Sequence, residues 1–154
     1  MKKIKYILPI TLLLFMTVGC FHKESNNQKT SINNNESTNS KEVIEYVKAI
    51  INEKEYIINL ENNETAKSFA NYLPQELQMS ELNGNEKYIY LDTSFPLNPT
   101  NPKRINAGDV MLYGDNCLVI FYKSFNTSYS YTKIGHINNI PNLGNGDITI
   151  KFEK

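Results

Sequence analysis

The stretch "DVMLYGDNCLVIFYK", residues 109–123, decides the fold. It has two apolar arms separated by Gly114, Asp115 and Asn116, which are turn-forming residues. This pattern predicts a β-hairpin whose strands are residues 109–113 and 117–123. The second arm has no polar residue from Cys117 to Tyr122, so we expect that strand to be buried on both of its faces.

Strand and turn signals of the same kind recur on both sides of this hairpin. Residues 95–105 carry three prolines and two asparagines, which predicts a long irregular loop, and residues 140–143 could form one helical turn. About eight short strands with one good helix favour a mainly β fold, closed into a barrel, over a doubly wound sheet. The other predicted strands are residues 45–51, 55–60, 76–82, 87–91, 129–137 and 147–152.

One helix is predicted over residues 64–73. Its apolar residues follow helical spacing, Asn63 suits the N-cap, and Pro74 ends the pattern. Ala66, Phe69, Ala70 and Leu73 occupy one face at i, i+3, i+4 and i+7.

Three stretches resemble a known family. "AKSFANYLP" (residues 66–74) looks like part of a cyclophilin-type barrel, and "LPQELQMSELNGNEKYIYL" (residues 73–91) and "INAGDVMLYGDNCLVIFYKSFNTSYSYTKIGHI" (residues 105–137) resemble the bacterial cyclophilin-like family. The resemblance covers nearly all of residues 45–153. It implies a closed, mainly antiparallel barrel of about eight strands with one or two short helices, and it implies no particular activity.

The residues that catalyse prolyl isomerisation in true cyclophilins do not carry over. Those enzymes use an arginine in a Phe-His-Arg stretch and a glutamine in a Gln-Gly-Gly stretch, with a tryptophan in the groove. This chain has neither stretch and no tryptophan, and Arg104 lies in the Pro/Asn-rich loop. We therefore assign no catalytic residue, and we expect no metal site and no cofactor because the two histidines and two cysteines show no ligand spacing.

The aromatic residues are the best indication of a binding site. Tyr88 and Tyr90 share one strand face, as do Tyr129 and Tyr131, and paired tyrosines can line a groove for a peptide or a small ligand. Covering the outer wall of the barrel is the alternative role for each pair. His136 is either a groove residue or a partly exposed strand histidine, and Cys117 is expected to be a buried core cysteine. The candidate groove residues are Glu86, Tyr88, Tyr90, Arg104, Tyr129, Tyr131 and His136.

The N-terminus predicts export and a lipid anchor. Residues 1–19 have lysines at the start followed by an apolar stretch, which is typical of a signal peptide. The segment "TVGC" at residues 17–20 resembles the bacterial lipobox, so Cys20 is expected to be lipidated and to become the new N-terminus. Cleavage after Gly19 without lipidation is the alternative. An acylated Cys20 would hold the protein on the extracytoplasmic face of the cell membrane.

Residues 20–41 are predicted to be a tether, because 12 of the 21 residues from 21 to 41 are Asn, Ser or Thr. The barrel domain is expected at residues 42–154. Without the three lysines of the signal peptide, the 16 basic residues fall to 13 against 16 acidic ones, a net charge of −3. This mild acidity argues against a nucleic-acid partner. The expected partners are the bilayer and a peptide or another envelope protein, and a monomer is expected.

Three functions are compatible with these observations. The favoured one is a lipid-anchored domain that binds a peptide or small ligand without catalysis. The others are an envelope prolyl isomerase or foldase, which rests on fold analogy, and a structural accessory that docks onto another envelope protein.

Overall fold

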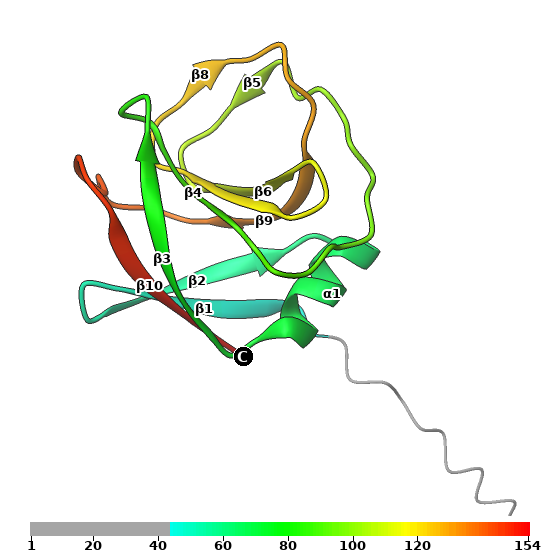
Figure 1. The fold of residues 1–154 in the computed structure, drawn as a ribbon, viewed down its shortest axis with the longest axis horizontal. Helices are drawn as coiled ribbons and strands as arrows, with labels where there is room; N and C mark the ends of the chain where they lie inside the picture. The colour runs from blue at the N-terminus through cyan, green and yellow to red at the C-terminus, as the bar shows by residue number, and fades with distance from the viewer. Residues whose placement is uncertain (1–43) are drawn as a thin grey trace, which may run out of the picture. The chain divides into compact units, whose positions relative to one another are not determined.

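The computed structural model describes residues 44–154, which form a closed antiparallel barrel with one helix (Figure 1). The order of strands around the barrel is β1-β10-β3-β4-β7-β6-β9-β2. The predicted eight-stranded barrel is confirmed for this part of the chain. Its strands are β1 (Tyr46–Ile51), β2 (Lys54–Leu60), β3 (Gln75–Leu82), β4 (Glu86–Tyr90), β6 (Asp109–Tyr113), β7 (Cys117–Phe121), β9 (Thr132–Ile137) and β10 (Ile148–Glu153).

The helix α1 (Glu64–Tyr72) forms where the sequence predicts it. Asn63 is the N-cap, since its side-chain oxygen accepts a hydrogen bond of 2.8 Å from the backbone amide of Ala66. The side-chain amide of Asn63 also donates to the carbonyl of Lys133 in β9, which fastens the helix to the barrel. Phe69 is buried edge-on against Phe152, with ring centroids 5.8 Å apart. The cap and the apolar face thus orient α1 together.

The apolar residues form two cores, one on each side of the barrel wall. Leu118 and Ile120 of β7 belong to the main core inside the barrel. Val119 and Phe121, at alternate positions, belong to a smaller cluster on the outer face. All of β7 is buried, as its unbroken apolar sequence predicts. The outer cluster also contains Ile105, Met111, Cys117 and Tyr131, with Tyr88 and Phe125 packed against it.

Ile105 and Phe125, which belong to or pack against the outer cluster, lie in two short strands where the sequence predicts no strand. β5 (Arg104–Ile105) pairs with β8 (Phe125–Asn126) in a two-stranded sheet separate from the barrel (Figure 1). Thr100 also forms an isolated bridge with Tyr131. The prolines prevent a longer ladder, but the chain pairs where they stop.

Two further predictions need correction. Residues 140–143 contain no helical turn, because Ile140 precedes Pro141 and a residue before proline is pushed out of the helical region. The strand predicted at residues 129–137 begins only at Thr132, since Tyr129 turns toward the outer face instead of joining the ladder.

Within residues 44–154, no helix has the length and apolarity needed to span a bilayer. The predicted signal peptide, Cys20 and the tether lie outside the described residues.

Candidate functional site

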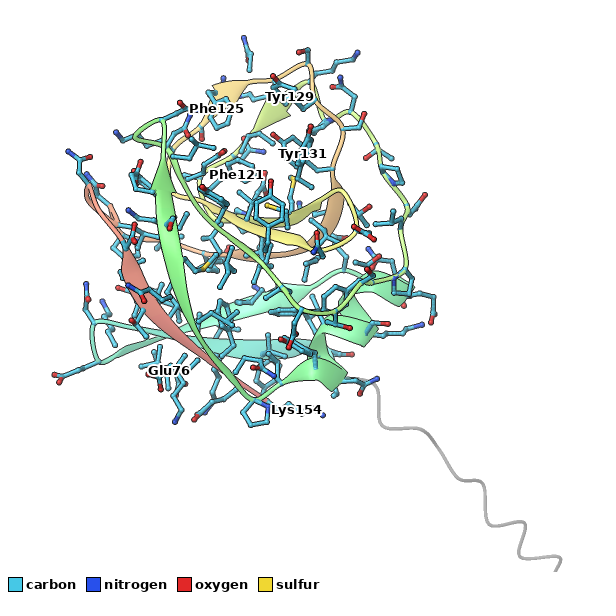
Figure 2. All side chains as sticks on the ribbon, in the orientation of Figure 1. Glu76, Phe121, Phe125, Tyr129, Tyr131 and Lys154 are labelled. Atoms are coloured by element: carbon cyan, nitrogen blue, oxygen red, sulfur yellow. The ribbon has the colours of Figure 1, made fainter. Side chains whose placement is uncertain are left out.

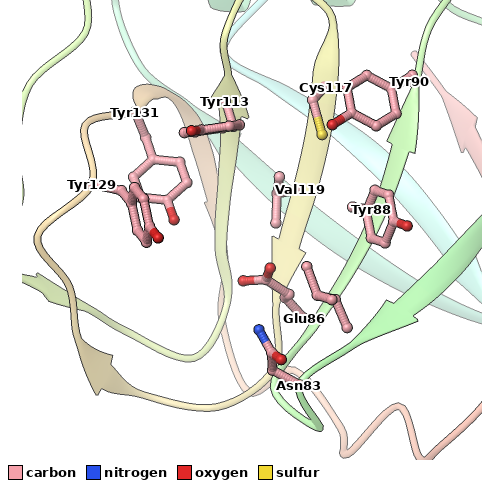
Figure 3. Close-up of a pocket in the computed structure, with 10 residues that line it drawn as sticks. Asn83, Glu86, Tyr88, Tyr90, Tyr113, Cys117, Val119, Tyr129 and Tyr131 are labelled. Carbon is pink, nitrogen blue, oxygen red and sulfur yellow. The ribbon is translucent and has the colours of Figure 1, made fainter.

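A pocket of about 330 Å³ lies on the outer face of the barrel wall, beside the outer cluster (Figure 3). Its wall comes from β4 and β7, its far side from Tyr113 and the segment before β9, and its lower edge from the turn between β3 and β4. The residues that line it are Leu82, Asn83, Glu86, Tyr88, Tyr90, Tyr113, Cys117, Val119, Tyr129 and Tyr131.

Strand periodicity explains why β4 and β7 contribute as they do. Successive side chains of a strand point to opposite faces, so Glu86, Tyr88 and Tyr90 of β4 share the outer face. Across the ladder, Tyr88 pairs with Val119 and Tyr90 pairs with Cys117. The apolar wall of the pocket is therefore built by the same alternation that divides the two cores.

The tyrosines form two groups on opposite sides of the pocket. The rings of Tyr88 and Tyr90 meet edge to face, with centroids 6.0 Å apart. The ring centroid of Tyr113 lies 6.0 Å from that of Tyr129 and 5.6 Å from that of Tyr131. Tyr131 is buried and rests on Phe121 (Figure 2), whereas Tyr90 and Tyr129 are 64% and 61% exposed. The pocket thus has a fixed aromatic floor and an accessible aromatic rim.

Glu86 is the one ionisable carboxyl group among the lining residues, and it lies between the two tyrosine groups (Figure 3). Burial, together with the nearby charge of Glu81, raises its pKa to about 6. None of the ten lining residues is a lysine, arginine or histidine. The pocket is therefore acidic at neutral pH, with no basic lining residue to balance the charge.

Cys117 behaves as a core residue at the edge of this site. It is buried, as predicted. Burial and the charge of Glu86 raise the pKa of the thiol, and these effects outweigh the opposing hydrogen bond from Tyr90. The thiol therefore stays protonated near neutral pH, which disfavours a nucleophilic role.

Five of the seven candidate groove residues line this pocket, namely Glu86, Tyr88, Tyr90, Tyr129 and Tyr131. The other two do not. Arg104 is exposed on β5, with its guanidinium 3.5 Å from the side-chain oxygen of Asn126. His136 lies on β9, where its Nδ1 is 3.1 Å from the carboxylate of Asp109.

The sequence-based selection missed Leu82, Asn83, Tyr113, Cys117 and Val119 as lining residues. The predicted hairpin places Tyr113 opposite Cys117 across the turn. The sequence gives no signal that the pocket lies beside this pair. The described residues contain no group of three or more His, Cys, Asp or Glu side chains that could hold a metal ion.

A second, larger pocket of about 670 Å³ lies beside α1 and the end of β2. Its charged lining residues include Glu64 and Lys67, which form an exposed ion pair of 2.8 Å with each other. No buried charge faces this space, so it has weaker features of a specific site than the tyrosine pocket has.

In residues 44–154, the closed antiparallel barrel with a single helix defines a small β-barrel class of domain. The family model of the cyclophilin-like family matches residues 49–153, and the chain belongs to this family. No curated protein and no solved structure matches the chain.

Proposed function

We propose that this protein is a membrane-anchored binding domain of the bacterial cell envelope that holds a peptide or small ligand in the tyrosine pocket without catalysing a reaction. The observation that carries the proposal is the pocket itself. It joins an apolar wall, five tyrosines and one carboxylate on a rigid barrel, and such a concave surface with a few convergent polar groups is the usual form of a ligand site.

The size of the pocket suits a small group. A volume of 330 Å³ corresponds to about ten water molecules at their share of liquid volume. A small metabolite or one long side chain of a peptide fits this volume, whereas a folded partner could reach only its rim. The fixed floor of Tyr131 and Val119 would lower the ordering cost of binding.

The anchor is the part of the proposal that rests on sequence. Acylation of Cys20 after removal of residues 1–19 would place the barrel outside the cell, with residues 21–41 as a tether. The substitution Cys20→Ser is expected to move the protein from the membrane fraction to the soluble fraction of cells. Retention of Cys20→Ser in the membrane fraction would contradict lipidation.

The alternative is a prolyl isomerase, which family membership brings into consideration. Isomerases of this kind polarise the proline amide with an arginine, and no arginine lines the pocket. Arg104 instead lies beside Asn126 in the β5–β8 sheet. The pocket therefore favours binding over this chemistry.

NMR on the full-length chain in non-ionic detergent separates the two functions. Short peptides, one of them containing Xaa-Pro, and a mixture of small polar fragments would be titrated while protein shifts and peptide exchange are recorded. Shifts at the pocket without exchange support the proposal. Cis–trans cross-peaks would favour the isomerase, since uncatalysed exchange takes tens to hundreds of seconds. The absence of both would contradict binding in the pocket and favour docking onto a protein partner.

A further inference from the structure

The barrel already contains one site in which a carboxylate and a tyrosine surround an ammonium group. Inside the barrel, the side chain of Lys87 is fully buried and forms an ion pair with Glu81. Its Nζ also lies 5.3 Å from the ring centroid of Tyr122, whose hydroxyl donates 2.8 Å to the same carboxylate. The ammonium also donates to the carbonyls of Gly144 and Gly146, so this fold holds a cation with one carboxylate, one tyrosine ring and two backbone carbonyls.

The outer pocket also combines a carboxylate with tyrosine rings. Glu86 replaces Glu81 as the carboxylate, and tyrosine rings are present on both sides of it. The described residues supply Glu86 with no ion pair, and no basic side chain lines the pocket. With a pKa of about 6, the carboxylate is mostly ionised at neutral pH and bears a desolvation cost that a bound cation would offset.

Tyrosine rings, like a carboxylate, attract a cation. The face of an aromatic ring is electronegative and attracts a cation within about 6 Å of its centroid. Tyr90 and Tyr129 are largely exposed on opposite sides of the pocket, so both rings are accessible to an incoming group. Their edge-to-face contacts with Tyr88 and Tyr113 hold them in place.

We propose that the tyrosine pocket binds an organic cation, an ammonium or guanidinium group, with Glu86 as its counter-ion and the surrounding tyrosines as its walls. This inference rests on the proposed binding function and names the chemical class of its ligand. The group can come from the lysine or arginine side chain of a peptide or from a free quaternary amine, and both present a positive charge to the same carboxylate.

The test is a titration of the full-length chain in non-ionic detergent with matched charged and neutral probes. The cationic probes are N-acetyl-lysine methylamide, N-acetyl-arginine methylamide and choline. The neutral counterparts are N-acetyl-norleucine methylamide and 3,3-dimethylbutanol. We expect saturable NMR shifts at pocket residues with the cations and at least about tenfold weaker binding of the neutral molecules. Preference for the two amino-acid probes indicates a peptide as the source, and preference for choline indicates a free quaternary amine.

Five variants separate charge recognition from general binding. Glu86→Gln is expected to weaken the binding of the cationic probes at least about tenfold and to leave the affinity for the neutral probes unchanged. Glu76→Gln makes the same charge change on the exposed surface of β3, far from Tyr129 (Figure 2), and should have no effect. Tyr129→Leu should weaken cation binding several-fold, while Tyr129→Phe keeps the ring and most of the affinity. Tyr46→Leu is the matched control at an exposed tyrosine outside the pocket.

The outcomes distinguish failure of this inference from failure of the proposed function. If the neutral probes bind the pocket as tightly as the cations, or if Glu86→Gln leaves cation affinity unchanged, the pocket is a binding site but not a cation site. If neither these probes nor the peptides and fragments above shift any pocket residue, both proposals are wrong.

Discussion

Glu86 and Lys87 are neighbours in β4 and lie on opposite sides of the barrel wall. The side chain of Lys87 is 0% exposed inside the barrel, whereas Glu86 lines the outer pocket. The charge of Lys87 is neutralised by Glu81, and its ammonium also donates to the carbonyls of Gly144 at 2.8 Å and Gly146 at 2.6 Å. The charge of Lys87 is thus paired inside the barrel and does not neutralise Glu86 in the pocket.

The Lys87 network is expected to be important for the stability of the barrel. Removing the ammonium with Lys87→Met leaves Glu81, whose side chain is 18% exposed, without its counter-ion. It also removes the ammonium donor from the carbonyls of Gly144 and Gly146, so that Gly144 keeps only the 3.4 Å hydrogen bond from the hydroxyl of Tyr122. We expect the free energy of unfolding to fall by about 3 kcal/mol, as measured by urea denaturation.

Two variants control for this prediction. Lys123→Met removes an exposed lysine that lies 5.7 Å from the same Tyr122 ring, and it should change stability by less than about 0.5 kcal/mol. The double variant Lys87→Met/Glu81→Leu should recover part of the loss, because no unpaired charge remains. Equal stability of Lys87→Met and Lys123→Met would show that the buried pair contributes nothing.

Glu86 is expected to destabilise the folded state above pH 6. Its pKa is about 6 in the folded protein against an ordinary value of 4.5, so the folded state binds more protons between these two pH values. Stability is therefore lost as the pH rises through this window. After allowance for partial solvent exposure, Glu86→Gln should raise the free energy of unfolding by about 1 kcal/mol at pH 7.5.

The pH profile provides the check on that prediction. The stability advantage of Glu86→Gln should shrink as the pH falls through this window and vanish below about pH 3.5, where the wild-type carboxyl is protonated in both states. A bound cation should also reduce the advantage, because it favours the ionised carboxylate. A difference between the two proteins that stays constant from pH 4.5 to 7.5 would mean that the pKa of Glu86 is not raised.

Residue periodicity predicted most of the barrel because the local signals and the packing agree. The apolar run of β7 predicted a strand buried on both faces, and the structure places a core on each side of it. The capped face of α1 likewise predicted the helix. What periodicity cannot supply is pairing between distant short segments. β5 and β8 have two residues each, which is too short for any alternation to appear.

The candidate site was predictable to the extent that it lies on strand faces. Glu86, Tyr88 and Tyr90 follow from the alternation of β4. Tyr129 and Tyr131 lie in the segment before β9, which forms an isolated bridge with Thr100 and reaches the same pocket. That long-range contact has no local signal. The sequence likewise has no signal that separates Arg104 and His136 from the groove residues, and the structure places them beside Asn126 and Asp109.

A close backbone approach makes Gly108 hard to replace. Gly108 has a φ of +100°, and a Cβ there would overlap the carbonyl oxygen of Ile137. Gly108→Ala is expected to cost about 3 kcal/mol of folding stability, from backbone strain together with this clash. Gly84 also has a positive φ, of +69°, but has open space around it. Gly84→Ala should therefore cost only about 1 kcal/mol. Thermal unfolding compares the two, and equal losses would show that the clash is relieved.

Arg104 and His136 are expected to make no contribution to ligand binding in the tyrosine pocket. Neither residue lines it: Arg104 faces Asn126 on the β5–β8 sheet, and His136 faces Asp109 on the barrel. Arg104→Ala and His136→Ala should therefore bind the cationic probes within about twofold of the wild type, a difference well below the tenfold that corresponds to 1.4 kcal/mol. The NMR titration measures this, with thermal unfolding to verify that both variants are folded. A larger loss of affinity in a folded Arg104→Ala variant would mean that the ligand extends from the pocket across the β5–β8 sheet.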